Sequence, residues 1–441
     1  MWKRIVYETL IGGAERRARW KWHHHSWGLV ATITVVLSAL ATYSATAESV
    51  DATEAELRER ALSGAARYSR IANVYAPQAA SSERAASTVA VTGQVLLEAF
   101  LATNNQLYLD KARKAADTIV GYPDMNHNGT YGWGRYWSKI EGSQSQPGDG
   151  SNTTFAVGCS LEKNKPYDDE MYDNARIGHF LLELYEVTGI PSYLEATRRM
   201  IDDTWNVGER NSDGGFFYFK TIGPCDRGWH VKNVNMLMAV PIALLARITG
   251  EPKYRERLKA VIRAELAEVR RMIDGKPAPN LGYYGVQTMR DHPTQGTYVS
   301  RAQTTDLTGP VSCNSKTGSG ESCTAHLGLE ARAIDIVLRT SDLGVLAVDD
   351  IKTIMAGHEA RDDEMCARPT TALGRMRSIT YCTAYYCALR HLEPRYLELC
   401  AERTKQFGPS TPDIVLGLFW GRSDRFRAPA QDGSTNGAVD K

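Results

Sequence analysis

Two adjacent aspartates are the strongest candidates for chemistry in this sequence. Asp168 and Asp169 follow a long aromatic segment and Tyr167, and they precede a helical pattern that begins near Met171. Within a regular helix neighbouring side chains diverge by about 100°, so both carboxyls reach one ligand only where the helix has not yet begun. This position favours a catalytic pair. The alternative is helix capping, because carboxylates at a helix N-terminus satisfy free N–H groups and meet the positive end of the helix dipole.

The segment before these aspartates has the composition of a carbohydrate site. Between residues 121 and 137, glycines alternate with aromatic side chains, with acidic and basic residues among them. Flat aromatic faces pack against the C–H faces of sugars, while carboxylate and guanidinium groups bind hydroxyls. The predicted substrate contacts are Asp124, Tyr131, Trp133, Arg135 and Trp137, together with Tyr167. The alternative for any single ring is that it folds the loop onto the helices behind it.

A second aromatic segment ends at the start of another predicted helix. Two glycines precede its aromatic run, at residues 214 and 215, and allow the backbone to approach a ligand closely. The predicted substrate-binding residues here are Phe217, Trp229, His230, Lys232 and Asn233. Lys232 and Asn233 at a helix start could bind hydroxyls or a carboxylate, whereas a lone histidine such as His230 is more often structural.

A repeated pattern indicates which elements position these segments. Four times an apolar helical stripe ends, a short turn follows, and a tyrosine opens the next helix, at Tyr108, Tyr193, Tyr254 and Tyr396. Glycine supplies the left-handed residue that ends a helix, and proline suits the start of the next one. Residues 325–340 followed by 348–359 can supply another hairpin. Each hairpin has one apolar face and must bury it against its neighbours.

The sequence therefore predicts an all-α fold, an (α/α)5–6 toroid of helical hairpins with long functional loops. An open solenoid would show regular repeat lengths, but long loops interrupt these hairpins at residues 121–166, 207–232 and 275–324. Such insertions are where function usually lies. We expect four parts: a signal segment over 1–47, a helical segment over 48–90, the toroid over 91–427, and a disordered tail over 428–441.

The N-terminus has the pattern of an export signal. Basic residues predominate over the first 27 positions, and an uncharged run from 26 to 47 ends in Ala45-Thr46-Ala47. A cleaved signal is favoured, and the alternative is a retained membrane tether through residues 29–47. In either case the rest of the chain is predicted to be exported, to the periplasm, the cell envelope or the medium.

Cysteine usage and charge narrow the classes of partner. All eight cysteines lie after the signal segment, where disulfides can persist, and Cys313 and Cys323 bracket a polar loop that a disulfide would close. No zinc-ligand spacing or glycine-rich phosphate loop is present, so we expect neither metal nor cofactor. With 52 basic and 51 acidic residues the net charge is +1, which argues against nucleic acid and leaves a glycan as the expected partner.

The order of these features resembles glycoside hydrolase family 76, the endo-α-1,6-mannanases, within the six-hairpin glycosidases. The shared features are Tyr-Asp-Asp, a helix, Thr-Gly-x-Pro-x-Tyr-Leu, Gly-Gly with aromatics, and Lys-Asn, over about residues 90–270. The resemblance implies that Asp168 and Asp169 are the catalytic pair. One carboxyl would protonate the leaving oxygen and the other would attack the anomeric carbon, which hydrolyses a polysaccharide such as an α-mannan.

Two other functions stay open. A polysaccharide lyase or an epimerase on the same toroid would abstract a proton beside a uronate carboxylate, with Arg227, His230 and Lys232 in the leading roles. A non-catalytic glycan-binding protein of the cell envelope would need no catalytic carboxylate. An unsaturated, ultraviolet-absorbing product would identify the lyase, and glycan retention that is insensitive to Asp168→Asn and Asp169→Asn would identify the binding protein.

Overall fold

The structure is a computed structural model, which describes residues 50–70, 85–121, 131–133, 171–207, 231–281, 320–367 and 383–422. The chain divides into two compact units, Met1–Glu56 and Leu57–Lys441. In the first unit, residues 50–56 are described and are helical. The helices that follow belong to the second unit.

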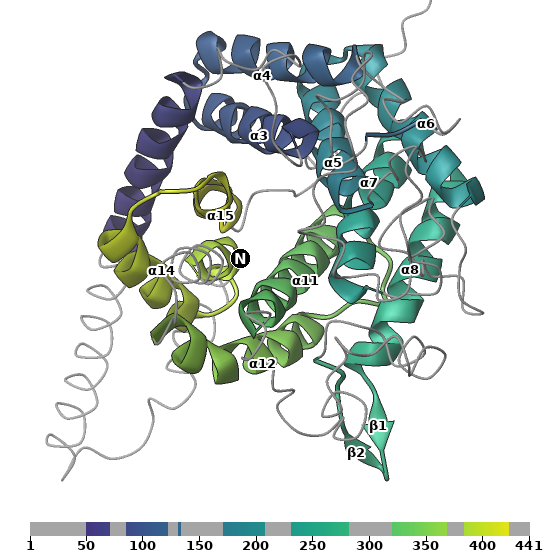
Figure 1. The fold of residues 1–441 in the computed structure, drawn as a ribbon, viewed down its shortest axis with the longest axis vertical. Coiled ribbons are helices and arrows are strands. Elements are labelled where there is room, and N and C mark those ends of the chain that lie inside the picture. Colours follow the sequence, from purple (N-terminus) through teal and green to yellow (C-terminus); the bar gives the residue numbers. More distant parts are fainter. Residues whose placement is uncertain are drawn as a thin grey trace, which may run out of the picture. The chain divides into compact units, whose positions relative to one another are not determined.

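The described part of the second unit contains five consecutive helical hairpins, each an inner helix, a short turn and an outer helix (Figure 1). The pairs are α3 (Ala85–Thr103) with α4 (Gln106–Val120), α5 (Met171–Thr188) with α6 (Pro191–Val207), α7 (Lys232–Thr249) with α8 (Pro252–Val269), α11 (Gly320–Thr340) with α12 (Val348–Ala367), and the helix at 383–389 with α14 (Pro394–Phe407). The helix α15 (Pro412–Trp420) follows them. A two-stranded antiparallel ribbon, β1 (Met272–Ile273) and β2 (Lys276–Pro277), pairs Met272 with Pro277.

The turns between inner and outer helices have the chemistry that the sequence predicted. Gly189 and Gly250 each have a φ of +67°, a left-handed conformation that costs glycine little and ends the inner helix. Proline opens the next helix at Pro252, where its missing N–H group has no helical partner to lose. Tyr193 and Tyr254 are fully buried. The Tyr193 hydroxyl donates to Asp117 of α4 at 2.6 Å and the Tyr254 hydroxyl to Asp202 of α6 at 3.2 Å, so each tyrosine joins its hairpin to the preceding outer helix.

The inner helices close into a ring. Contacts join α3 to α5, α5 to α7, and α7 to α11. The helix at 383–389 then packs Tyr385 against Gly328 of α11 and Ala384 against Gly417 of α15. The ring closes where α15 contacts α3. The predicted toroid of paired helices is thus confirmed for the second unit.

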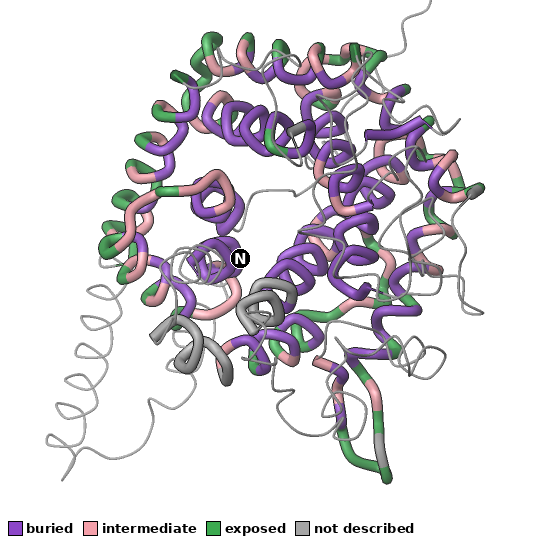
Figure 2. The backbone as a smooth tube through the Cα atoms, viewed as in Figure 1, coloured by how far each residue is buried: buried purple, intermediate pink, exposed green. Residues whose placement is uncertain are grey.

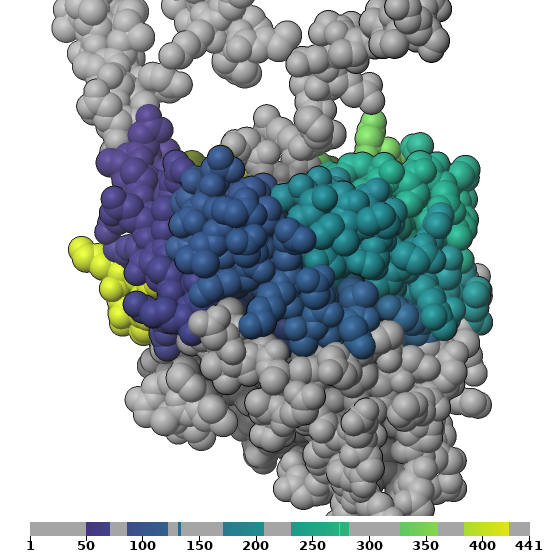
Figure 3. Space-filling model, turned by 90° about the horizontal axis from the view of Figure 1, so that it is seen from above, coloured from purple at the N-terminus to yellow at the C-terminus, as the bar shows by residue number. Residues whose placement is uncertain are grey.

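The last inner helix takes its outer partner from the beginning of the unit. Gly64 packs against Val415 of α15, and the Tyr68 hydroxyl donates to the Ser410 carbonyl at 3.1 Å. The helix at 57–70 also lies beside the α3–α4 hairpin, because Lys111 of α4 donates to the hydroxyl of Ser69 at 2.9 Å. Figure 3 shows these segments in contact, in purple and blue. The described residues therefore form six pairs, and closure buries the apolar face that a terminal hairpin would expose.

The inner helices begin at the same rim of the ring. Asp413 near the start of α15 pairs with Arg332, whereas the carbonyl of Trp420 at its end accepts a hydrogen bond from Arg339, seven residues farther along α11. These two helices therefore run in the same direction. Connections from an outer helix to the next inner helix cover residues 121–170, 208–231, 270–319 and 368–382, and they attach at this rim. The segments predicted to be functional belong to these long connections.

The inner layer of helices is more buried than the outer layer. In Figure 2 the inner helices are buried on most sides, and the outer helices expose one face. Fourteen of the 18 residues of α7 are buried, against five of the 15 residues of α4. Among the described helices, one window, Ala86–Thr103 of α3, is long and apolar enough to cross a membrane, but 72% of it is buried inside the protein. Its apolarity is accounted for by its place in the core.

One disulfide lies between the two helices of the fifth hairpin. Cys387 of the helix at 383–389 is bonded to Cys400 of α14, with the two Cα atoms 4.8 Å apart. This disulfide ties an inner helix to its outer partner. Cys313 lies outside the described residues, so its predicted disulfide with Cys323 stays a prediction.

Candidate active site

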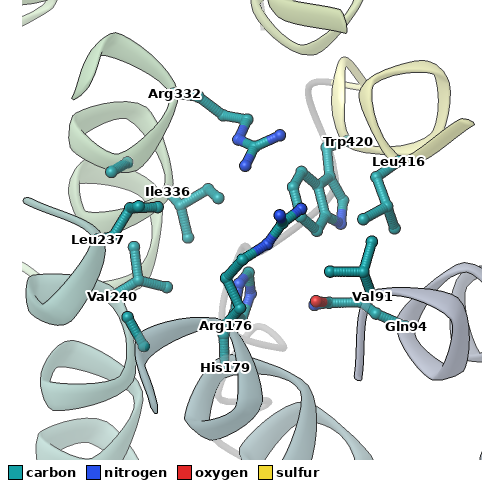
Figure 4. A pocket seen from close by; sticks show the side chains of 12 residues that line it. Val91, Gln94, Arg176, His179, Leu237, Val240, Arg332, Ile336, Leu416 and Trp420 are labelled. Carbon is teal, nitrogen blue, oxygen red and sulfur yellow. The ribbon is translucent and has the colours of Figure 1, made fainter. Parts of the chain in front are cut away.

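A pocket lies on the axis of the ring, between five inner helices. Its lining comes from α3, α5, α7, α11 and α15, and consists of Val91, Gln94, Ala175, Arg176, His179, Leu237, Val240, Arg332, Ala333, Ile336, Leu416 and Trp420 (Figure 4). We call it the axial pocket. Its water-accessible volume is about 20 Å³, which is room for one or two water-sized groups. The pocket therefore has room for a small polar group but not for a sugar ring.

Two arginines and one aspartate form the polar side of the axial pocket. Arg176 Nη2 donates to Asp413 Oδ1 at 2.6 Å, and Arg332 Nη1 donates to the same oxygen at 3.4 Å. Arg176 also donates to the Tyr172 hydroxyl at 2.7 Å. Figure 4 shows both guanidinium groups directed into the space between α5 and α11. Asp413 therefore holds two cations side by side.

The two arginines change the acidity of the aspartate between them. Burial by itself would raise the pKa of Asp413, because it disfavours the charged form. The positive charges of Arg176 and Arg332 outweigh burial and lower the pKa of Asp413 below its ordinary value. Asp413 is therefore an anion at neutral pH.

Trp420 forms an aromatic wall beside this cluster. The guanidinium carbon of Arg332 lies 5.0 Å from the centre of the Trp420 ring, within the range of a cation–π interaction. His179 stacks on the ring of Trp420, with the ring centroids 5.3 Å apart and the ring planes at 29°. Trp420 Nε1 donates to Glu98 Oε1 at 2.8 Å, which fixes the indole in its plane.

Beyond this wall lie two buried carboxylates that bind their neighbours. Gln94 Nε2 donates to Glu183 Oε2 at 2.6 Å, and His179 Nε2 lies 3.4 Å from Glu183 Oε1. Glu98 and Glu183 are only 2% and 3% exposed. The contacts of Glu183 fix Gln94 and His179 on the side of these residues that faces away from the pocket. Polar groups in a closed, low-dielectric ring are costly unless paired, and such clusters are typical of functional sites.

Most predicted site residues lie outside the described residues. These are the aspartates Asp168 and Asp169 and the contacts Asp124, Arg135, Trp137, Tyr167, Phe217, Trp229 and His230. Their roles stay predictions. The described ones are Tyr131, Trp133, Lys232 and Asn233, and none of them lines the axial pocket.

The two described aromatic residues of the first loop pack against the ring. Trp133 is fully buried, with its backbone N–H donating to Asn174 Oδ1 at 2.8 Å and its Nε1 donating to the Ile119 carbonyl at 3.0 Å. The backbone N–H of Tyr131 donates to Asp203 Oδ2 at 2.8 Å. Contacts with the protein account for the burial of both rings.

Lys232 and Asn233 are buried at the start of α7. Lys232 is 1% exposed, donates to the Asn280 carbonyl at 2.6 Å and pairs with Glu330 Oε2 at 3.2 Å. This ion pair joins α7 to α11. Asn233 is also 1% exposed. Access to a sugar at these two positions would require the start of α7 to open.

The polar residues of the axial pocket are absent from the sequence prediction. Arg176 and His179 interrupt the apolar stripe of α5, and Arg332 interrupts that of α11. Charged residues on the core side of a helix were the signal that could have identified them. Within the described residues no group of three or more His, Cys, Asp or Glu side chains could hold a metal ion.

Comparison with known proteins gives matches only among solved structures. No protein-family model matches the chain, and no curated protein matches it. A cellobiose 2-epimerase from Spirochaeta thermophila is 14% identical, with a TM-score of 0.43 and 73% of each chain covered. A family 76 α-mannanase from Bacteroides thetaiotaomicron is 12% identical, with a TM-score of 0.46 and coverage of 76% of this chain and 84% of that one.

A third solved structure is a family 105 glycoside hydrolase from C. acetobutylicum. It is 13% identical, has a TM-score of 0.46, and the match covers 78% of this chain and 81% of that one. At these identities the similarity is one of fold. The chain is thus similar in fold to structures of carbohydrate-active enzymes.

Proposed function

We propose that this protein is an exported carbohydrate-active enzyme that hydrolyses glycosidic bonds of a polysaccharide at the rim of the axial pocket. The observation that carries the proposal is the convergence of five inner helices on one pocket, whose apolar lining includes a few polar side chains. The long connections that hold the predicted aromatic and acidic residues attach at the rim where those helices begin. Concave sites with a few converging polar groups in an apolar lining are typical of small-molecule and substrate sites.

Asp168 and Asp169 are the proposed catalytic carboxyls. Asp169 lies two residues before Met171, where α5 begins, and Arg176 lies further along the same helix. One carboxyl gives its proton to the glycosidic oxygen as the bond to the anomeric carbon breaks, and the other attacks that carbon. Water then completes hydrolysis and restores the first proton. The α-mannan substrate is the one that the resemblance implies.

The axial pocket would position the substrate and not supply the acid. Glu98 and Glu183 already accept hydrogen bonds from Trp420 and Gln94, and both are almost completely buried. Asp413 is held between two arginines. These three described carboxylates are thus engaged by protein groups, which supports the assignment of acid and nucleophile to the aspartates that precede α5.

Export is part of the same proposal. The basic N-terminal segment and the uncharged run over 26–47 support a signal, with cleavage favoured over a retained tether. The disulfide between Cys387 and Cys400 supports an oxidising compartment, because structural disulfides are rare in the cytosol. The intact mass of the exported protein would distinguish cleavage from retention.

The test is turnover of a glycan panel by the full chain, purified in its exported form. Neutral α-mannan and uronate polymers are incubated with it, and reducing ends and ultraviolet absorption are both measured. We expect new reducing ends without ultraviolet absorption. Asp168→Asn and Asp169→Asn should each lower turnover by about 10²–10⁴-fold with the glycan still bound.

The matched control is Asp349→Asn, which removes an exposed carboxylate from the first turn of the outer helix α12. It should leave turnover unchanged. Unsaturated products would replace the hydrolase by a lyase. Glycan binding without turnover in the unmutated protein would replace it by a binding protein.

A further inference from the structure

We propose that Arg176 and Arg332 form a carboxylate-binding subsite, so that the glycan acted on at the axial pocket contains a uronic acid residue. This inference rests on the proposed function for the identity of the ligand as a sugar, and it replaces the neutral α-mannan that the resemblance implies by an acidic glycan. The observation behind it is two guanidinium groups, from α5 and α11, that enter one small pocket and share a single carboxylate, Asp413.

The stronger evidence for this subsite is the environment of Arg332. Its side chain is 4% exposed, and a guanidinium has five N–H donors. In the described part of the chain it makes one hydrogen bond, a long one of 3.4 Å to Asp413. Its guanidinium carbon also lies over two ring faces, 5.0 Å from the centre of Trp420 and 5.8 Å from that of Tyr385. Ring faces accept a cation but leave its in-plane donors available.

The charges around the pocket favour an anion at the arginines. Arg176 and Arg332 contribute two positive charges, and Asp413 contributes one negative charge between them. The other described carboxylates nearby, Glu98 and Glu183, lie beyond Trp420 and Gln94 and accept hydrogen bonds from them. Arg332 makes its one described hydrogen bond to Asp413, at 3.4 Å, so a second carboxylate beside Asp413 could accept from its other N–H groups.

The size and lining of the pocket favour a carboxylate over a larger group. A volume of about 20 Å³ accepts the oxygens of a planar carboxylate but not a sugar ring. The guanidinium fork matches the two oxygens of a carboxylate, and apolar side chains such as Val240 and Ile336 exclude water and strengthen the contact. The sugar that bears the carboxylate would lie on the rim side, toward the residues that precede α5.

The experiment measures binding of matched sugars to the full exported chain by titration calorimetry. The probes are glucuronate and galacturonate, their neutral counterparts glucose and galactose, and inorganic sulfate as the anion that a sulfated glycan would present. We expect each uronate to bind about ten- to a hundredfold more tightly than its neutral counterpart, as charge-assisted hydrogen bonds imply. The preference should weaken as salt is added.

Arg332→Gln and Arg176→Gln should each abolish the preference for uronates, and Arg332→Lys should retain part of it. Arg263→Gln, on an exposed position of the outer helix α8, is the matched control and should retain all of it. If Arg332→Gln does not fold, Arg332→Lys keeps the cation and still tests the fork, because lysine lacks the planar pair of donors.

Three results would each refute a different claim: the uronate subsite, the proposed function, or the choice of a carboxylate as the ligand. Turnover of neutral glycans with no preference for uronates would refute the subsite and leave the proposed function intact. Uronate binding with no turnover of any glycan would refute the proposed function and leave the subsite. Tighter binding of sulfate than of either uronate would refute the choice of carboxylate.

Discussion

Lys232 and Glu330 form a buried ion pair whose disruption has a calculable cost. The Lys232 and Glu330 side chains are 1% and 2% exposed, and Nζ lies 3.2 Å from Oε2. Lys232→Met keeps the length of the side chain but removes the Lys232 charge from beside the buried Glu330 carboxylate. Removal of one partner of a buried pair typically costs about 3–5 kcal/mol.

Protonation of Glu330 sets an upper limit on that cost. Neutralising an ordinary glutamate costs about 1.4 kcal/mol for each pH unit above its usual pKa of about 4.3, or about 4 kcal/mol at pH 7. Lys232→Met should therefore lower the free energy of unfolding by about 3–4 kcal/mol at pH 7. This loss of stability should become smaller as the pH falls toward 5, because protonation of Glu330 in the folded variant then requires less free energy.

The assay is urea unfolding of the exported chain, followed by tryptophan fluorescence, at pH 7 and pH 5. The double variant Lys232→Met, Glu330→Met removes both charges, and it should be more stable than Lys232→Met alone. A loss below about 1 kcal/mol at pH 7, or a deficit independent of pH, would refute the reasoning. Loss of glycan turnover at unchanged stability would instead support the predicted role of Lys232 in substrate binding.

Three further predictions follow from single contacts. Asp413→Asn should lower the free energy of unfolding by about 1–3 kcal/mol at pH 7. Because the two arginines lower the pKa of Asp413, its ionised form stabilises the fold above about pH 4, and this stabilisation is lost as the pH falls through the lowered pKa. Denaturation measured from pH 7 to pH 3 should therefore show the stabilities of the variant and the unmutated protein converging. Gly328→Ala would place a methyl group on the buried ring of Tyr385 and should cost about 1–3 kcal/mol in urea unfolding, and an unchanged midpoint would contradict the packing of α11. Replacing Cys387 and Cys400 by serine should cost about 2–4 kcal/mol, checked against the unmutated protein with and without reductant, since the disulfide closes a short loop between residues 13 apart.

The sequence by itself determined the all-α architecture and the hairpins. The reason is local, because a left-handed glycine such as Gly189 ends one helix and a tyrosine such as Tyr193, buried in the structure, marks the start of the next. These signals act within one hairpin. They repeat along the chain, so a closed ring of five or six hairpins could be inferred from the need of each hairpin to bury its apolar face.

Only the tertiary structure decided which polar residues meet on the axis. Arg176 and Asp413 are 237 positions apart, and Arg332 and Asp413 are 81 apart, so no local pattern connects them. Ring closure brings them together because the inner helices converge and start at one rim. The same closure buries Lys232, which the sequence predicted at a substrate site, in an ion pair with Glu330, 98 residues farther along the chain. Polar chemistry in this fold thus depends on which side of an inner helix faces the axis, and helix packing sets that orientation.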